Sequence, residues 1–280
     1  MKPAEPVHGL AVLLPYRLAP TRMSVRISPL SAAILCFCAT MAVSTAWAQT
    51  TPTMLSPLQV ILKWSPLLLR GFAFNILISL LAMLLGTVAG LGLGLALVSE
   101  FRPLASISWL VTQFFRNAPW LVLLFFVMFL VPFQVTIFKT TIPLPDWVKA
   151  TVGFALPVMA NVAEVVRGAV RSVPSTQWEA AESLSFTRRQ MMWLIILPQC
   201  IKRMLPPWMN IYALVAMATV LASIVGVSEM LTLTAQVHAA EGGRPELFAP
   251  LYGFALLCFF LYCYPINLWT ARLERRFRIR

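Results

Sequence analysis

Ionisable side chains within apolar stretches are the first places where this chain could do chemistry. Glu164 lies in such a stretch, with Asn161 three residues before it and Arg167 three residues after it. Asn161, Glu164 and Gly168 fall near one helical face. Because charged groups are costly within a membrane, they are usually paired or functional. Two interpretations follow: an ion pair between Glu164 and Arg167 within one helix, or a polar face along a solute pathway.

Three further polar residues, Asn75, Thr219 and Ser223, lie in two other apolar stretches. Each either lines the same pathway or makes a hydrogen bond between helices. No nucleophile is paired with a base, and the five cysteines lack the spacing of metal ligands. We therefore predict no catalytic residue and no bound metal.

The composition indicates the elements that must hold these residues. The chain is 59% hydrophobic and 11% charged, with a mean hydropathy of +0.80, whereas ordinary soluble domains are about 25% charged. We predict an all-α membrane protein. The net charge of +12 could suggest nucleic acid, but the hydropathy argues against such a partner.

Charge-free runs long enough to cross a bilayer predict a core of five transmembrane helices. Before this core, residues 23–48 have a basic start, a short apolar stretch and the small-residue pattern Ala46-Trp47-Ala48. We interpret them as a signal peptide or an extra N-terminal transmembrane helix, and residues 1–22 as an upstream extension. The five expected spans are 71–98, 108–131, 151–170, 208–228 and 248–270.

Basic residues predict the orientation of the chain. Lys and Arg gather in the segment 167–203 and in the C-terminal tail, and such segments tend to be cytoplasmic. The loops 132–150 and 229–247 should then face outward. The core would begin on the periplasmic side and end in the cytoplasm.

A polar island at 173–200 interrupts the apolar pattern. Thr176 to Glu179 and Thr187 to Gln190 each have the form of a capping box. We expect helices at about 177–184 and 188–196, the second ended or kinked by Pro198. The alternative is a long amphipathic loop lying on the lipid headgroups.

The same island carries a specific resemblance. Glu179-Ala180-Ala181, followed at fixed spacing by Ile195 and Leu197-Pro198, resembles the EAA signature of ABC importer permeases. Ser185 stands where that family has glycine. Glycine at this position permits a positive φ. With serine there, the tightness of the predicted turn is an open question.

Residues 60–275 resemble the polar amino acid branch of these permeases, of the histidine, glutamine and glutamate type. The order and spacing of several short segments carry the likeness. They are Phe-Arg-Asn-Ala-Pro (115–119), Ala-Glu-Val-Val-Arg-Gly (163–168), Ser-Val-Pro (172–174) with Gln-Trp-Glu (177–179), Gly-Val (226–227) with Glu229, and Ala-Gln (235–236).

The resemblance implies a five-helix permease domain of the type I importer fold, with 173–200 as its cytoplasmic coupling loop. It implies a polar amino acid as cargo, alternating access as the mechanism, and the bacterial inner membrane as the location. The coupling residues would be Trp178, Glu179, Ala180, Ala181, Leu184, Ser185, Arg188 and Arg189.

The implied partners are a dimer of ABC ATPase subunits, a periplasmic solute-binding protein and a second permease, identical or homologous. Gly86, Gly90 and Gly94 would offer that permease a packing surface. The sequence lacks a Gly-x-x-x-x-Gly-Lys-Ser/Thr loop. We therefore expect no cofactor on this chain, with ATP and Mg in the partner ATPase. The competing hypothesis is a stand-alone secondary transporter or channel for a small polar solute, and another is a non-transporting anchor or sensor for an ATPase.

Overall fold

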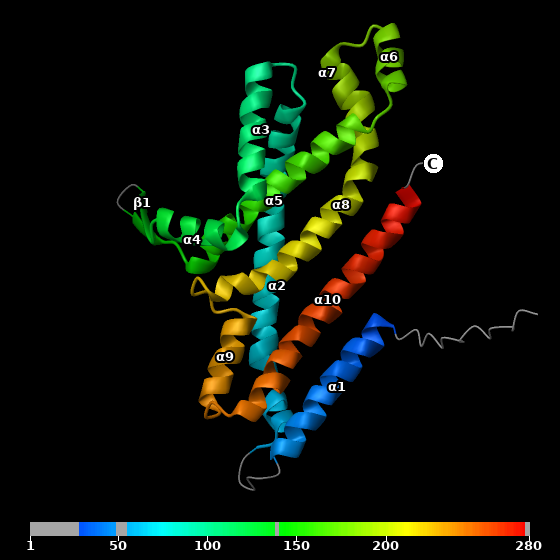
Figure 1. The fold of residues 1–280 in the computed structure, drawn as a ribbon. Coiled ribbons are helices and arrows are strands. Elements are labelled where there is room, and N and C mark those ends of the chain that lie inside the picture. Colours follow the sequence, from blue (N-terminus) through cyan, green and yellow to red (C-terminus); the bar gives the residue numbers. More distant parts are fainter. Residues whose placement is uncertain (1–27, 49–54, 138–139, 278–280) are drawn as a thin grey trace, which may run out of the picture.

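The protein is described from a computed structural model, which places residues 28–48, 55–137 and 140–277 (Figure 1). Helices dominate, and one small antiparallel hairpin accompanies them. The elements in chain order are α1 (Pro29–Ala48), α2 (Pro57–Leu97), α3 (Arg102–Asn117), α4 (Trp120–Leu130), β1 (Gln134–Ile137), β2 (Thr140–Pro143), α5 (Asp146–Arg171), α6 (Ser175–Ser183), α7 (Arg188–Gln190), the π-helical η1 (Met191–Ile196), α8 (Leu197–Ala218), the 3-10 helix η2 (Thr219–Ser223), α9 (Met230–Ala240), the 3-10 helix η3 (Pro245–Leu247) and α10 (Phe248–Phe277).

Close packing of α2 against α5 forms the centre of the molecule. Added Cβ atoms on the glycines at positions 86, 90 and 94 would approach atoms of α5 to 2.4, 2.7 and 2.6 Å. Those distances are too short for any side chain, so the glycines let the two backbones approach closely. The expectation that this stripe receives a second permease is therefore wrong, because α5 of the same chain covers it. The facing pairs are Gly86 with Val158, Gly90 with Val162 and Gly94 with Val166.

The membrane spans follow the sequence pattern with one break. In the described residues, four helical runs are long and apolar enough to cross a membrane, and α3 with α4 makes a fifth if the bent pair is one span. The expected span 108–131 is not one straight helix, since the chain bends by 107° between its two parts. The cause is Pro119, which forces Ala118 into an extended backbone (φ −73°, ψ 136°).

The fourth span begins earlier than 208. The helical run is continuous from Arg188 to Ser223, so Pro198 does not end the second hairpin helix. The π-helical turns of η1 precede this proline. Because proline lacks an N–H, the wider π geometry accommodates the missing hydrogen bond. The run then ends at Ser223, before the expected 228, and the chain unwinds through Gly226, whose φ is +89°.

The chain after this unwound segment is fastened to the beginning of α2. Glu241, which ends α9, accepts hydrogen bonds from Lys63 Nζ and Trp64 Nε1, each at 2.7 Å. Arg244 donates to the carbonyl of Leu55 at 3.2 Å. The turn between α9 and α10 is thus held against the first residues of α2.

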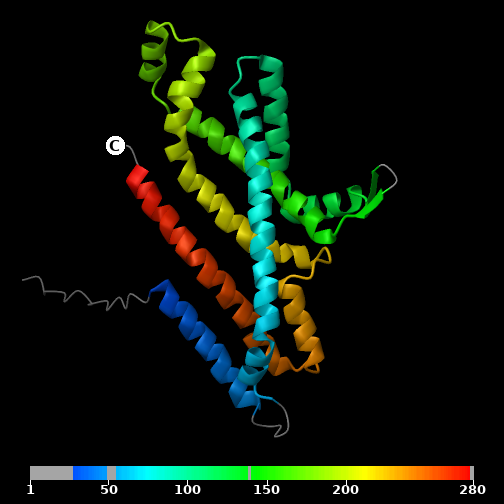
Figure 2. The ribbon, with the colours of Figure 1, turned by 180° about the vertical axis from the view of Figure 1, so that it is seen from behind.

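The apolar segment near the N-terminus forms helix α1, which lies beside α10 in both views (Figures 1 and 2). Phe37 and Thr40 lie next to Gly253 of α10. The residues 1–27 lie outside the described part, so the proposed basic start of a signal and the upstream extension lie there too. Whether 23–48 is cleaved stays a prediction.

Candidate functional site

The predicted coupling loop is a helical hairpin at one end of the molecule, formed by α6 and α7 (Figure 1). Its second capping box is confirmed: Thr187 Oγ1 accepts from Gln190 N, and Gln190 Oε1 accepts from Thr187 N at 2.9 Å. The prediction of a first capping box, from Thr176 to Glu179, is wrong. Helix α6 begins at Ser175, before Thr176, because Pro174 is the cap residue and its carbonyl accepts from Gln177 N.

The turn that ends α6 uses the backbone conformation that glycine favours, although the residue is a serine. Ser185 has a φ of +57°. Phe186 N donates to the carbonyl of Ala181 at 3.2 Å, and Ser185 N donates to that of Glu182 at 2.8 Å. This pair of bonds is a Schellman motif. The turn is therefore tight, and Ser185 bears the cost of the left-handed conformation.

The hairpin side chains divide into two groups. Ala181 is buried, whereas Leu184 is 72% exposed at the tip. Arg188 is held within the chain: its guanidinium lies 4.3 Å from the centre of the Trp178 ring, and its Nε is 3.1 Å from Oε1 of Glu100. Trp178 packs on the cluster beneath the hairpin. The exposed members of the predicted coupling set are Glu179, Ala180, Leu184, Ser185, Arg188 and Arg189.

Glu164 lies in a polar cluster that joins α3 to α5. Arg167 NH2 is 2.6 Å from Glu164 Oε2, which is the ion pair that the sequence suggested. From α3, Gln113 donates to Glu164 Oε1 at 3.3 Å and Arg116 approaches to 3.9 Å. The Glu164 carboxylate is thus already paired with donors from two helices.

Asn75 and Thr219 form a buried network with Glu229. Asn75 Nδ2 donates to Thr219 Oγ1 at 3.1 Å and to Glu229 Oε2 at 2.9 Å, while Asn75 Oδ1 accepts from Met230 N. Glu229 is fully buried and caps α9 through its carboxylate. The interhelical interpretation fits Asn75 and Thr219, because neither is exposed.

The remaining two pathway candidates bond within their own helices. Asn161 donates to the carbonyl of Pro157 at 2.8 Å, and Ser223 donates to that of Val220 at 2.7 Å. The structure therefore does not bring the five predicted pathway residues together. Asn75 and Thr219 are hydrogen-bonded to each other, whereas Asn161 and Glu164 lie on α5 and Ser223 ends η2 with no hydrogen bond to that pair. In the described ranges, no group of three or more His, Cys, Asp or Glu could hold a metal ion.

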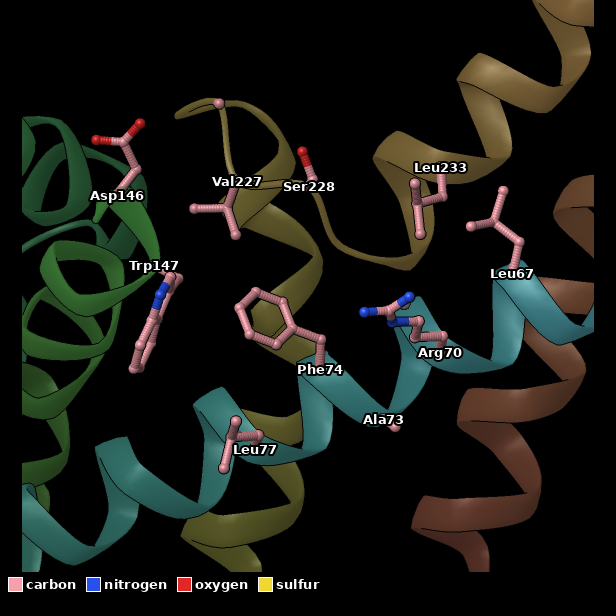
Figure 3. A pocket seen from close by; sticks show the side chains of 12 residues that line it. Leu67, Arg70, Ala73, Phe74, Leu77, Asp146, Trp147, Val227, Ser228 and Leu233 are labelled. Carbon is pink, nitrogen blue, oxygen red and sulfur yellow. The ribbon is translucent and has the colours of Figure 1, made fainter.

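A cavity of about 660 Å³ lies between α2, the start of α5 and the unwound segment before α9 (Figure 3). It is lined by Arg70 and Asp146, neither of which is among the site residues predicted from the sequence. The sequence does contain a pattern that could have identified Arg70. Arg70, Phe74 and Leu77 follow at i, i+4 and i+7, so they share one helical face, and all three line the cavity.

Comparison with known proteins agrees with the fold and the motifs. Residues 85–279 match the family described as "Binding-protein-dependent transport system inner membrane component". The chain is 34% identical over 212 residues to the probable amino-acid ABC transporter permease protein YckA of Bacillus subtilis, covering 76% of this chain and 89% of that one. It is 29% identical over 212 residues to the L-cystine transport system permease protein TcyB of the same organism, covering 75% and 86%.

Solved structures show the same arrangement of helices. An amino acid ABC transporter crystallised with histidines superposes with a TM-score of 0.68 at 23% identity, over 80% of this chain and all of that one. The MetNI methionine ABC transporter in an inward-facing conformation gives 0.60 at 16% identity, over 76% and 97%. The predicted permease fold of type I importers is confirmed. The family match spans more than half of the sequence, and this chain belongs to the binding-protein-dependent transport system inner membrane component family.

Proposed function

We propose that this chain is the transmembrane subunit of an ATP-binding-cassette importer that moves a polar amino acid across the bacterial inner membrane. The observation that carries the proposal is the projecting α6–α7 hairpin with the intact EAA spacing. Leu184 is 72% exposed at the tip of the hairpin, where its side chain is available to a partner surface. Relatives named for amino acids, cystine and glutamine support the cargo class.

In this proposal the hairpin enters a groove on a separate ATPase subunit. Leu184 and Ala180 supply apolar contact, while Glu179 and Arg189 supply polar contacts at the rim. Arg188 has a different task, since its stacking on Trp178 and its ion pair with Glu100 tie the hairpin to the chain. ATP and Mg belong to the ATPase dimer. Closure of that dimer pulls on the hairpin and drives alternating access.

The continuous helix from Arg188 to Ser223 supports this coupling. It begins inside the hairpin and ends next to the unwound segment at the cavity, so a displacement of the hairpin reaches the cavity through hydrogen-bonded backbone. The proposed permease domain is 60–275, with 173–200 as its coupling loop. Residues 23–48 are a signal peptide or an additional helix.

The other partners occupy the remaining surfaces. A periplasmic binding protein delivers the solute to the loops 132–150 and 229–247, which lie outside in the proposed orientation. A second permease completes the pathway. Because α5 covers the glycine stripe of α2, that second permease packs on another face.

The decisive experiment is charge reversal at the hairpin. Glu179→Arg should leave the protein in the membrane but abolish uptake of the amino acid, while ATP hydrolysis by the partner no longer responds to substrate. Glu274→Arg is the matched control, since it makes the same charge change at an exposed position of α10. Uptake and ATPase activity are measured in vesicles holding the complete importer.

Normal uptake by Glu179→Arg would remove the coupling role from the hairpin. Copurification in mild detergent tests the same proposal independently. An ATPase subunit should remain bound to the wild-type chain and be lost from Glu179→Arg but retained by the control. A wild-type chain that transports the solute without any ATPase would establish the stand-alone transporter instead.

A further inference from the structure

Helix α1 presents one regular face to α10, beside which it lies in both views (Figures 1 and 2). A small cavity of about 130 Å³ lies between the two helices, and the side chains around it recur at a helical spacing. They are Ala33, Cys36, Phe37 and Thr40 on α1, and Gly253, Leu256, Leu257 and Phe260 on α10. Residues at i, i+3, i+4 and i+7 share one side of a helix. Each helix therefore offers the other a continuous stripe.

Gly253 lets α1 approach α10 closely. A Cβ added there would lie 3.5 Å from Thr40 Oγ1 and 3.7 Å from Phe37 Cδ2, so both α1 side chains lie against the α10 backbone. The Thr40 hydroxyl donates to the carbonyl of Phe37 at 2.8 Å, within its own helix. The contact therefore needs no polar partner from α10, and a small residue sets its spacing, as is common between membrane helices.

Met41 extends the contact into an apolar cluster that α2, α9 and α10 share. Val60, Met230 and Leu251 are buried in that cluster, and Met41 packs against it. Helix α1 also contacts α2 and η3 directly. Removal of α1 would therefore uncover apolar surface on several later elements of the fold.

The length of α1 suits a membrane span. Its apolar part Pro29–Ala42 is shorter than the four runs described above, but the helix continues to Ala48 without a charged residue. Its 20 residues measure about 30 Å, which is the thickness of the hydrocarbon core. Apolar side chains also project from the side away from α10, namely Leu30, Ile34 and Leu35.

The ends of α1 agree with retention in the membrane. The pattern Ala46-Trp47-Ala48 lies in the last turn of the helix, whereas proteolysis favours exposed loop segments. Four basic residues and one acidic residue precede the helix in the sequence, and such basic segments tend to stay cytoplasmic. A sixth span brings both ends of the chain to the same side, which is the cytoplasm in the proposed orientation.

We propose that α1 is a retained sixth transmembrane helix, which occupies the Gly253 face of α10 and leaves the N-terminus in the cytoplasm. The family match begins at residue 85, so α1 lies outside the matched domain. Because α1 fills this face of α10, a second permease packs elsewhere. The proposal is independent of the importer function, since its contacts involve neither a cargo nor an ATPase.

The first measurement is the mass of the mature chain. The full chain with a C-terminal affinity tag is purified from membranes in mild detergent, and its intact mass and N-terminal peptides are determined. We expect the mature chain to contain residues 29–48, whether translation starts at Met1 or Met23. The matched control combines Ala46→Leu with Ala48→Leu, which removes the small-residue pattern and should change the mass only by the two substitutions. A wild-type chain that begins at Gln49 would overturn the proposal.

A disulfide tests where the retained helix lies. In a chain whose native cysteines are replaced by alanine, Thr40→Cys with Gly253→Cys should cross-link under mild oxidation. The Cβ added at position 253 lies 3.5 Å from the Thr40 side chain, which is within reach of a disulfide. A protease site inserted between α1 and α2 reveals the bond, because the two fragments stay joined until they are reduced. Leu35→Cys with Gly253→Cys is the matched control, since Leu35 is 59% exposed on the other side of α1, and it should not cross-link.

The cross-linked product must be a single chain. A missing bond in Thr40→Cys with Gly253→Cys, an equal yield in the control, or a bond between two chains would each overturn the proposal. Gly253→Cys alone should give no linked pair of chains, and such a pair would place a second permease on this face. Ser28→Cys, exposed before α1, should react with an impermeant maleimide only in inverted vesicles, and labelling from outside would contradict a cytoplasmic N-terminus. The mass measurement uses the wild-type chain, so it decides retention even where a variant fails to fold.

Discussion

The backbone strain of the α6–α7 hairpin is concentrated at Ser185. Its positive φ costs a residue with a Cβ about 1 kcal/mol relative to glycine. The Schellman bonds and the capped start of α7 hold it in place from both sides. The hairpin therefore keeps its tight turn, although the conformation of this serine lowers its stability.

Ser185→Gly should stabilise the hairpin by roughly 0.5–1 kcal/mol, since glycine adopts the left-handed conformation without a steric penalty. Slower hydrogen exchange at the amide of Phe186 would report the change.

Ser183→Gly is the paired control. It lies in the last turn of α6, where glycine should destabilise the helix by about 0.5–1 kcal/mol. Faster exchange after Ser185→Gly would contradict the assignment of strain to this residue.

Residue-level chemistry was only partly predictable. The EAA spacing and the Thr187 cap are local patterns, and the chain shows both. The sequence did not predict Arg70 as a cavity residue, because a charged residue is usually taken to mark the end of an apolar run. Its exposure to a cavity depends on α9 crossing α2 at Gly71, a contact between residues far apart in sequence.

At the scale of elements, the α2–α5 contact leaves no room for larger side chains at three positions of α2. Gly86, Gly90 and Gly94 of α2 leave no room for a Cβ, whereas Gly92, on the same helix, has no atom within 4 Å of such a position. The two kinds of glycine therefore differ only in what faces them.

Gly90→Leu should disrupt the contact, lowering the thermal midpoint of the detergent-purified protein or preventing its folding. Overpacking of a close contact typically costs about 1–3 kcal/mol. Gly92→Leu should leave the midpoint unchanged, because its side chain points into open space. Fluorescence-monitored melting of both variants measures the difference. Equal midpoints would show that the close approach is not needed.

Prolines show why element boundaries resisted prediction. Pro119 breaks its span by 107°, yet Pro198 is absorbed by a π-helical segment within a continuous helix. Both sequences carry the same local signal. The outcome depends on whether neighbouring turns can rearrange their hydrogen bonds, which a single sequence does not reveal.

At the scale of the whole molecule, the two proposed interaction regions lie apart. The α6–α7 hairpin lies at one end, and the turn after α9 lies toward the other (Figure 1). Hydropathy predicted the number and order of the spans well, because each needs a long apolar run. It gave no sign that Glu229 is buried, since that burial arises when α9 folds back along α2.

The proposed orientation predicts which ends an impermeant reagent can reach. In a chain whose native cysteines are replaced by alanine, Ala240→Cys should react with a membrane-impermeant maleimide in intact cells with a permeabilised outer membrane. Ser183→Cys should react only in inverted vesicles. Both positions are exposed, so accessibility reports the side of the membrane. Labelling in the opposite pattern would reverse the orientation.

Helix α2 is long enough to act as a lever in the proposed coupling. This helix of 41 residues is about 60 Å long and is gripped by α5 around Gly90. Arg70 lies about 30 Å from that fulcrum and Leu97 about 10 Å from it on the other side. Leu97 adjoins the segment that Glu100 ties to the hairpin. Because α9 also packs against α2 at Gly71, a tilt of α2 about Gly90 would carry the start of α9 with it, about threefold farther than the accompanying motion at Leu97.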